Sequence, residues 1–185
     1  MMIAKRILLI LSIIVAALSF QGCEYVKAYR LASGFLDCEL DLSSKMIRVE
    51  NGEAHECEYL QKSPVYVIYY SPDECSKCAI NHMLANKPYF DFSKRQGGFE
   101  TIIVVAPKED SFSEILALAE QQELAFPIYI DKDHHLEAQG VIPNDERVHN
   151  FLLDKEGTVS YIGRPLTSEN TQKRFIQCLT KLNDK

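Results

Sequence analysis

The apolar positions of the chain gather into short runs that polar turns separate. Val65–Tyr70 contains only β-branched and aromatic side chains, which is typical of a strand buried on both faces. Shorter or less uniform runs predict four further strands, at Thr101–Ala106, Phe126–Ile130, Phe151–Leu153 and Thr158–Ile162. Asp154–Gly157 lies between the last two runs and predicts a hairpin turn.

Helical patterns fill the intervals between these strands. Cys75–Lys87 is predicted to be a helix that breaks or kinks at Pro88, because proline lacks the N–H that a helix interior needs. Ser111 and Glu114 fit a capping box, which predicts a second helix ending near residue 123. His134–Val141 predicts a short helix.

A last helix is predicted near the C-terminus, capped by Thr167 or Ser168. Its apolar residues share one face: Phe175, Ile176, Leu179 and Leu182. Strands that alternate with helices favour a parallel sheet covered on both faces, and the final hairpin adds an antiparallel edge. The predicted fold class is therefore α/β, with a central mixed sheet flanked by helices.

The segment before this sheet predicts a small β extension. Residues 35–60 contain the runs CELDL and KMIRVE, and Asn51-Gly52 is a strong signal for a tight turn. We expect a β-hairpin or three short strands. Residues 23–60 are interpreted as a tether and N-terminal β extension, and residues 61–185 as the main domain.

The N-terminus has the pattern of an export signal. Lys5 and Arg6 precede Ile7–Phe20, an apolar run of the length of a signal h-region and short for a membrane span. Gly22-Cys23 follows, which resembles a bacterial lipobox. We predict a lipoprotein signal peptide at residues 1–22 and a lipid anchor on Cys23, which places the protein on the periplasmic side of a bacterial membrane. An ordinary signal or an uncleaved anchor is the alternative.

Composition narrows the classes of function. With 185 residues and 46% hydrophobic content, the chain is long and apolar enough for one domain with a sizeable core. The formal net charge is -6, and no basic patch or stripe is present, so nucleic acid is not an expected partner.

The chemistry-bearing motif is Cys75-Ser76-Lys77-Cys78, at the point where the first long strand is predicted to pass into a helix. The positive end of a helix favours a thiolate at its first turn, so Cys75 is the expected attacking thiol. Lys77 would favour the thiolate, whereas Asp73 and Glu74 would oppose it. Cys78 lies one turn further in and is the expected resolving thiol, shielded by its neighbours.

Three stretches, CSKC, FPIYIDKD and FLLDKEGTVSYIG, together resemble the thioredoxin fold. More narrowly, the chain resembles the membrane-anchored extracytoplasmic proteins of the alkyl hydroperoxide reductase and thiol-specific antioxidant superfamily, over about residues 65–182. The resemblance implies a thiol–disulfide oxidoreductase that exchanges disulfides with protein thiols, without a bound cofactor.

The sequence departs from the pattern of that family at two positions. The chain contains no tryptophan, and Glu74 stands where the family has one before the first cysteine. Val148 stands where the family has a cis-proline that faces the cysteines, and the nearest proline is Pro143. A redox-silent thioredoxin-fold lipoprotein that binds a partner is therefore one alternative function.

A copper chaperone is a second alternative, because Sco-type chaperones combine this fold with two cysteines and a downstream histidine. His149 is the candidate here, but we predict that it is not a required ligand and that no metal is bound. His82 follows Cys78 on the same helical face and His134-His135 is expected in a solvated turn.

The remaining cysteines are expected to be structural. Cys38 and Cys57 flank the predicted hairpin and could form a disulfide, although connectivity cannot be deduced from sequence. Cys178 lies beside the apolar face of the last helix and is predicted to be a buried, inert thiol.

Overall fold

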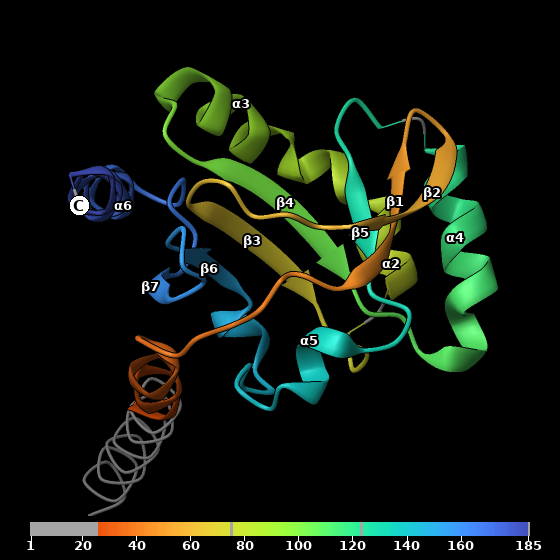
Figure 1. The fold of residues 1–185 in the computed structure, drawn as a ribbon, viewed down its shortest axis with the longest axis horizontal. Helices are drawn as coiled ribbons and strands as arrows, with labels where there is room; N and C mark the ends of the chain where they lie inside the picture. The colour runs from red at the N-terminus through yellow and green to blue at the C-terminus, as the bar shows by residue number, and fades with distance from the viewer. Residues whose placement is uncertain (1–25, 75, 123, 185) are drawn as a thin grey trace, which may run out of the picture.

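A computed structural model of the chain describes residues 26–74, 76–122 and 124–184. In these residues seven strands form one sheet in the order β2-β1-β5-β4-β3-β6-β7 (Figure 1). The strands are β1 (Lys45–Glu50), β2 (Glu53–Glu58), β3 (Val65–Tyr70), β4 (Glu100–Val105), β5 (Ile128–Ile130), β6 (Asn150–Leu153) and β7 (Val159–Ile162). β3, β4 and β5 are parallel, and the other neighbours are antiparallel. The predicted mixed sheet is confirmed.

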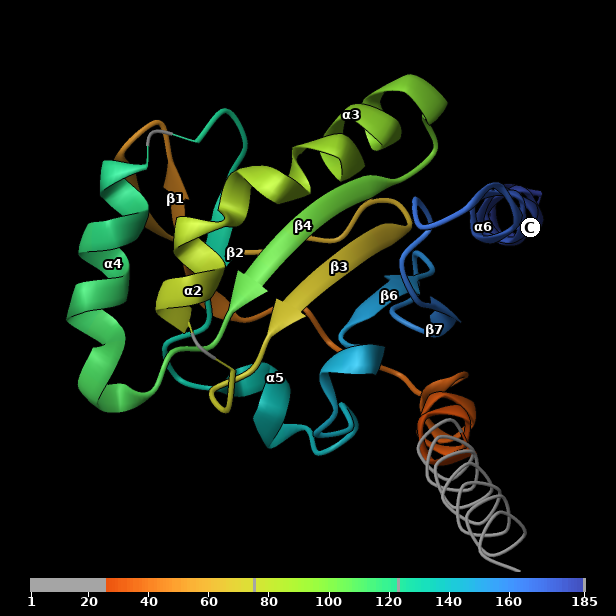
Figure 2. The same ribbon diagram turned by 180° about the vertical axis from the view of Figure 1, so that it is seen from behind.

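Helices cover both faces of this sheet (Figures 1 and 2). One face packs against α2 (Ser76–Asn81), the 3-10 turn η1 (Met83–Asn86), α3 (Lys87–Gln96), α4 (Phe112–Gln121) and α6 (Glu169–Asn183). The other face packs against α5 (His135–Ala138) and the segment from Phe35 to Leu42. Two further 3-10 turns are η2 (Glu109–Ser111) and η3 (Glu146–Val148).

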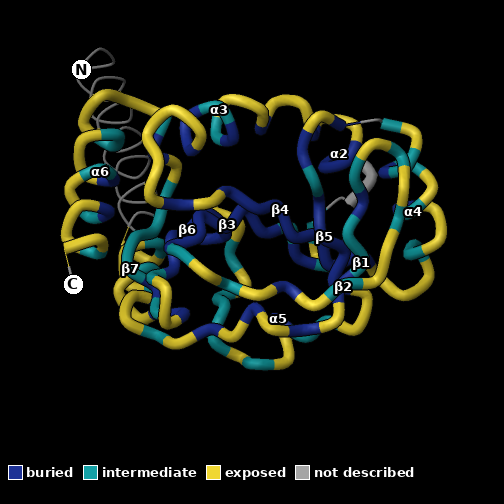
Figure 3. The backbone as a smooth tube through the Cα atoms, turned by 45° about the horizontal axis from the view of Figure 1, so that its top comes forward, coloured by how far each residue is buried: buried dark blue, intermediate teal, exposed yellow. Residues whose placement is uncertain are grey.

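The central strand β3 divides the core into two apolar clusters. Tyr66 and Ile68 point to the side of α3 and α6, whereas Val67 and Tyr69 point to the side of α5. Because helices cover both faces, the strand is apolar at nearly every position and does not alternate. The tube in Figure 3 shows β3 to β6 buried and the outer helices largely exposed. The predicted redox motif directly follows the turn at the C-terminal end of this buried strand.

The N-terminal extension is a hairpin and not three strands. β1 and β2 pair antiparallel around Asn51 and Gly52, which both have positive φ. The run CELDL forms only an isolated bridge, from Glu39 to Thr158. Residues 26–35 before it are helical. β1 also pairs with β5, so the extension belongs to the same sheet as the main domain.

Two local predictions were wrong. Ser111 precedes α4 but makes no capping hydrogen bond, because its hydroxyl donates to the carbonyl oxygen of Lys108 at 2.9 Å. Pro88 does not end a helix. The interruption lies at residues 82–86, and Pro88 sits in the first turn of α3, where no N–H is needed. At the last helix Ser168 is the cap, in a capping box with Thr171.

The predicted signal peptide and Cys23 lie outside the described residues. In the part of the chain that the structure describes, no helix is both long and apolar enough to cross a membrane.

Candidate functional site

The turn between β3 and α2 is closed by its own hydrogen bonds. The backbone N–H of Glu74 donates to the carbonyl oxygen of Ser71 at 3.0 Å. In return, the N–H of Ser71 donates to Glu74 Oε1 at 3.1 Å. β3 ends at Tyr70 and α2 begins at Ser76, so the CxxC motif falls at a strand-to-helix junction. Cys75 itself lies outside the described residues, as does the side chain of Lys77.

Cys78 lies in α2 and is exposed, which corrects the prediction that it is shielded. Ala79 and Ile80 are the buried residues of this helix, and they turn Cys78 to the outside. Cys78 is disulfide-bonded. Its partner is none of the other described cysteines, because Cys38, Cys57 and Cys178 are free thiols.

The three free thiols pack against other parts of the fold, away from the CxxC motif. The disulfide between Cys38 and Cys57 that the sequence left open is absent, since each packs separately against the apolar cluster on the α5 side. Cys178 is half-buried and not fully enclosed as predicted, and its Sγ lies 3.3 Å from the carbonyl oxygen of Ser160. Burial raises the pKa of both Cys57 and Cys178. A raised pKa reduces the thiolate fraction, so neither thiol is well suited to exchange chemistry.

A largely buried contact between Glu74 and His149 joins the redox turn to the segment before β6. Nδ1 of His149 lies 2.6 Å from Glu74 Oε1, and the side chains are 3% and 21% exposed. Burial acts to raise the pKa of Glu74, but the hydrogen bonds from His149 and Ser71 outweigh it and hold the pKa below its ordinary value. Glu74 is therefore a carboxylate at neutral pH.

The other ring nitrogen of His149 also faces an acceptor. Nε2 lies 2.8 Å from the carbonyl oxygen of Pro143, and the ring packs edge-on against Tyr69 at a centroid distance of 5.2 Å. A neutral imidazole has one N–H, whereas the imidazolium has two. With a carboxylate at one nitrogen and a carbonyl at the other, donation to both acceptors requires an N–H on each ring nitrogen.

The segment that carries His149 is ordered by further contacts. Asp145 caps η3 by accepting the N–H of Arg147, and Asn144 Nδ2 donates to Asp73 Oδ2 at 2.9 Å. Val148 is buried at the end of η3, and the described residues contain no cis peptide bond. The family's cis-proline thus has no counterpart at Val148, and side-chain contacts hold the segment against the redox turn instead.

A cleft of about 230 Å³ opens beside Glu74. Its polar lining comes from β3, the residue before η1, η1, α3, η3, β6 and the loop after β7: Tyr70, His82, Asn86, Tyr89, Glu146, Asn150 and Arg164. Within it, Asn86 Nδ2 donates to the hydroxyl of Tyr70 at 3.0 Å. Sequence reasoning named only Glu74 and His82 among the lining residues. Tyr70 is the last residue of β3 and Arg164 lies two residues after the end of β7, and these positions at strand ends are the one signal that could have found them.

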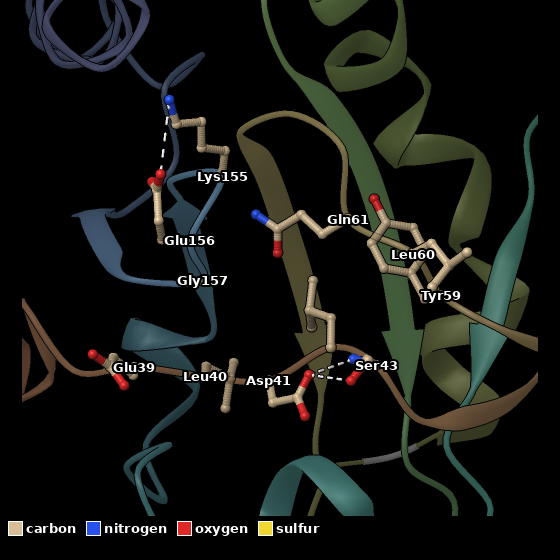
Figure 4. A pocket seen from close by; sticks show the side chains of 11 residues that line it. Glu39, Leu40, Asp41, Ser43, Tyr59, Leu60, Gln61, Lys155, Glu156 and Gly157 are labelled. Carbon is tan, nitrogen blue, oxygen red and sulfur yellow. Dashed lines mark hydrogen bonds and ion pairs between the residues drawn. The ribbon is translucent and has the colours of Figure 1, made fainter. Parts of the chain in front are cut away.

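A second pocket, of about 370 Å³, lies at the opposite end of β3 (Figure 4). Leu153 pairs with Val65 at the start of β3, so the hairpin turn that follows β6 is remote from Glu74. The lining comes from three surface segments, at residues 39–43, 59–61 and 155–157. None of the predicted site residues lies there.

Neither a protein-family model nor a curated protein matches this chain. Solved structures are similar to it at low identity. One is assigned as the thiol:disulfide interchange protein DsbE of Chlorobium tepidum, at 15% identity, covering 77% of this chain and 98% of that one with a TM-score of 0.47.

Two further similar structures come from other bacteria. The exposed lipoprotein thioredoxin Etrx1 of Streptococcus pneumoniae is 20% identical, with 74% and 98% coverage and a TM-score of 0.41. AhpC of Enterococcus faecalis is 10% identical, with 80% and 92% coverage and a TM-score of 0.46.

The class of fold follows from the topology itself. β3 and β4 are parallel neighbours joined through helices, and β4 and β5 are joined through α4. On the other side of β3 lies the antiparallel hairpin of β6 and β7, which α6 follows. The chain has a thioredoxin-like α/β fold.

Proposed function

We propose that this protein is a thiol–disulfide oxidoreductase that works through Cys75 and Cys78. One observation carries the proposal: the CxxC sequence falls at the junction where the buried strand β3 ends and α2 begins. The free N–H groups at the start of a helix favour a thiolate there. The disulfide-bonded state of Cys78 and the raised pKa of Cys57 and Cys178 support this assignment of roles.

The exchange proceeds in two balanced steps. The Cys75 thiolate attacks one sulfur of a substrate disulfide, forming a mixed disulfide and releasing the other substrate sulfur as a thiolate. The Cys78 thiolate then attacks the Cys75 sulfur, which releases the second substrate thiolate and leaves a disulfide between Cys75 and Cys78. Two electrons pass from the protein to its substrate, and the reverse sequence oxidises a substrate dithiol. The cleft beside Glu74 is the proposed place for the polypeptide that carries the substrate sulfur.

Trapping of mixed disulfides tests this proposal. Cys78→Ser removes the resolving thiol, so this variant should accumulate covalent adducts with a labelled peptide that carries a disulfide. Cys75→Ser should accumulate few such adducts. Cys178→Ser is the matched control, because its half-buried thiol has no part in the exchange. Equal trapping by the Cys75 and Cys78 variants, or none by either, would contradict the assigned roles.

We further propose that the protein works outside the cytoplasm, lipid-anchored through Cys23 after removal of residues 1–22. The apolar run that ends beside Cys23 supports this. Cys23→Ser should release the protein from membranes or leave it unprocessed. A variant that is processed and membrane-bound as before would contradict the anchor.

The copper alternative is less favourable on chemical grounds. Both ring nitrogens of His149 already hold hydrogen bonds, so coordination would break the contact to Glu74 or to Pro143. We expect the reduced protein to bind copper equally well before and after His149→Ala in an anaerobic titration. Tight stoichiometric binding that the substitution abolishes would favour the chaperone.

A further inference from the structure

Glu74 is bonded directly to Cys75, and it stands where a negative charge is unfavourable for the proposed chemistry. A carboxylate near a thiol disfavours the thiolate, and a partly buried charge is screened less than an exposed one. The side chain of Glu74 is only 21% exposed. An unbalanced carboxylate there would oppose the nucleophile that the exchange needs.

A protonated His149 would balance this charge. Its Nδ1 lies 2.6 Å from Glu74 Oε1 and its Nε2 lies 2.8 Å from Pro143 O. Such a pair would carry no net charge, so Glu74 would accept hydrogen bonds without presenting a net negative charge to the neighbouring residue. The contact with Glu74 also fixes the turn against the segment before β6, because Glu74 Oε1 accepts the N–H of Ser71 within the turn.

We propose that Glu74 and His149 are positioning residues that hold the redox turn as a charge-balanced pair, with His149 preventing the Glu74 carboxylate from opposing formation of the Cys75 thiolate. This inference rests on the proposed oxidoreductase function. It joins Glu74, which departs from the thioredoxin-like pattern before the first cysteine, to the residue that follows Val148, the second departing position.

Other groups that titrate or carry charge lie around the pair, and the test must separate them from it. They come from β3, the end of β5, α5, η3, the start of η1, the loop after β7 and the redox turn itself: Tyr69, Asp131, Glu137, Glu146, Arg147, His82, Arg164 and Asp73. Of these, Asp73 shares the turn with Glu74 but is exposed, so solvent and salt screen its charge. Asp73→Asn is therefore the matched control.

The experiment measures how fast iodoacetamide alkylates Cys75 in the reduced protein as a function of pH, with each cysteine followed separately by mass spectrometry of its peptide. His149→Gln should shift the midpoint of Cys75 upward by about one pH unit, a roughly tenfold slower alkylation below both midpoints. Glu74→Gln should leave the midpoint in place or lower it. The double variant should return to within about 0.3 unit of the wild type, and Asp73→Asn should move it less than His149→Gln.

Cancellation in the double variant is the result that a purely structural contact would not give. An unmoved midpoint in His149→Gln, an upward shift in Glu74→Gln, or a double variant shifted as far as His149→Gln would each overturn the proposal. If His149→Gln does not fold, nitrogen NMR of the wild type decides instead. Protons on both ring nitrogens at pH 7 support the pair, and a neutral ring overturns it.

Failure of the proposed function would look different. A protein without exchange activity would form no mixed disulfide with a peptide in the Cys78→Ser background, yet its alkylation profile could still show the cancellation. Exchange activity without cancellation would leave the oxidoreductase standing and remove the pair from its mechanism.

Discussion

The two ends of β3 differ in how far their charged side chains are buried. At the C-terminal end, the carboxylate of Glu74 and the imidazole of His149 are withdrawn from water and held by short hydrogen bonds. At the N-terminal end, the charged side chains that line the pocket of Figure 4 are solvated, and the ion pair there joins Lys155 and Glu156 at 54% and 63% exposure.

The two pockets therefore differ in how strongly they indicate a functional site. Burying a charge costs free energy that only good pairing offsets, whereas an exposed charge costs almost nothing. The pocket at the N-terminal end has the greater volume, about 370 Å³ against about 230 Å³, but it lacks a buried charged group among its described lining residues. The buried contact between Glu74 and His149 costs free energy and lies at the end of β3 that carries the CxxC motif. It is therefore the stronger indication of a functional site.

The largest expected difference in stability between the two ends comes from removing one partner of each ion pair. His149→Ala leaves the Glu74 carboxylate without its imidazolium and should lower the free energy of unfolding by about 3 kcal/mol. Lys155→Ala breaks an exposed pair and should change it by less than about 0.5 kcal/mol. Urea denaturation followed by circular dichroism measures both. Similar losses would mean that the Glu74–His149 contact is not a buried charged pair.

The backbone, and not a side-chain pair, is the sensitive feature of the N-terminal end. Gly157 has φ +90°, and a Cβ there would lie 2.8 Å from the carbonyl oxygen of Leu40. Gly157→Ala should therefore cost about 2 kcal/mol of unfolding free energy. Gly34→Ala is the control, because Gly34 lies in a helix with no atom within 4 Å of the added Cβ, and it should be neutral or stabilising. Equal effects in thermal unfolding would show that the hairpin turn has room to relax.

Lowering the pH should affect the contribution to stability differently at the two ends of β3. The pKa of Glu74 is lowered in the folded protein by His149 and Ser71, against the opposing effect of burial. A lowered pKa adds stability that is complete above about pH 4.3, the ordinary value for glutamate, and that is lost as pH falls through the folded value. Glu74→Gln should therefore narrow the difference in stability between pH 6 and pH 3. Glu156→Gln, at an exposed site, should leave that difference unchanged.

The smallest effect is expected at Tyr69. Its hydroxyl is buried and makes no hydrogen bond to the described residues, although the ring packs against His149. Tyr69→Phe keeps the ring and removes the unsatisfied hydroxyl, so unfolding free energy should stay the same or rise by up to about 1 kcal/mol. Calorimetry that showed a clear loss would mean that the hydroxyl has a partner, such as a buried water.

Much of the fold could be predicted because local patterns and tertiary structure agree. β3 reads as a buried strand since both its faces are covered, and Asn51-Gly52 forms the predicted turn. Prediction from the sequence failed where a residue could take more than one hydrogen-bond partner or more than one position in a helix. Ser111 bonds to Lys108 and not to its own helix, and the register of Pro88 decides whether it ends or starts a helix.

The candidate site was only partly predictable for the same reason. The CxxC motif is local and visible, Glu74 stood out as a departure from a family pattern, and His149 stood out as a candidate metal ligand. Their contact joins residues 75 positions apart, so only the packing of the segment before β6 against the redox turn could reveal it. The same holds for Arg164, which reaches the cleft from the loop after β7.

The central claim is that Cys75 and Cys78 form a reversible redox pair. The most direct measurement equilibrates the protein with glutathione or dithiothreitol buffers of graded potential and maps each disulfide by alkylation and mass spectrometry. We expect one two-electron transition confined to Cys75 and Cys78, with Cys38, Cys57 and Cys178 reduced throughout. A disulfide that excess dithiothreitol leaves intact in the folded protein, or a pair that never forms one, would contradict it.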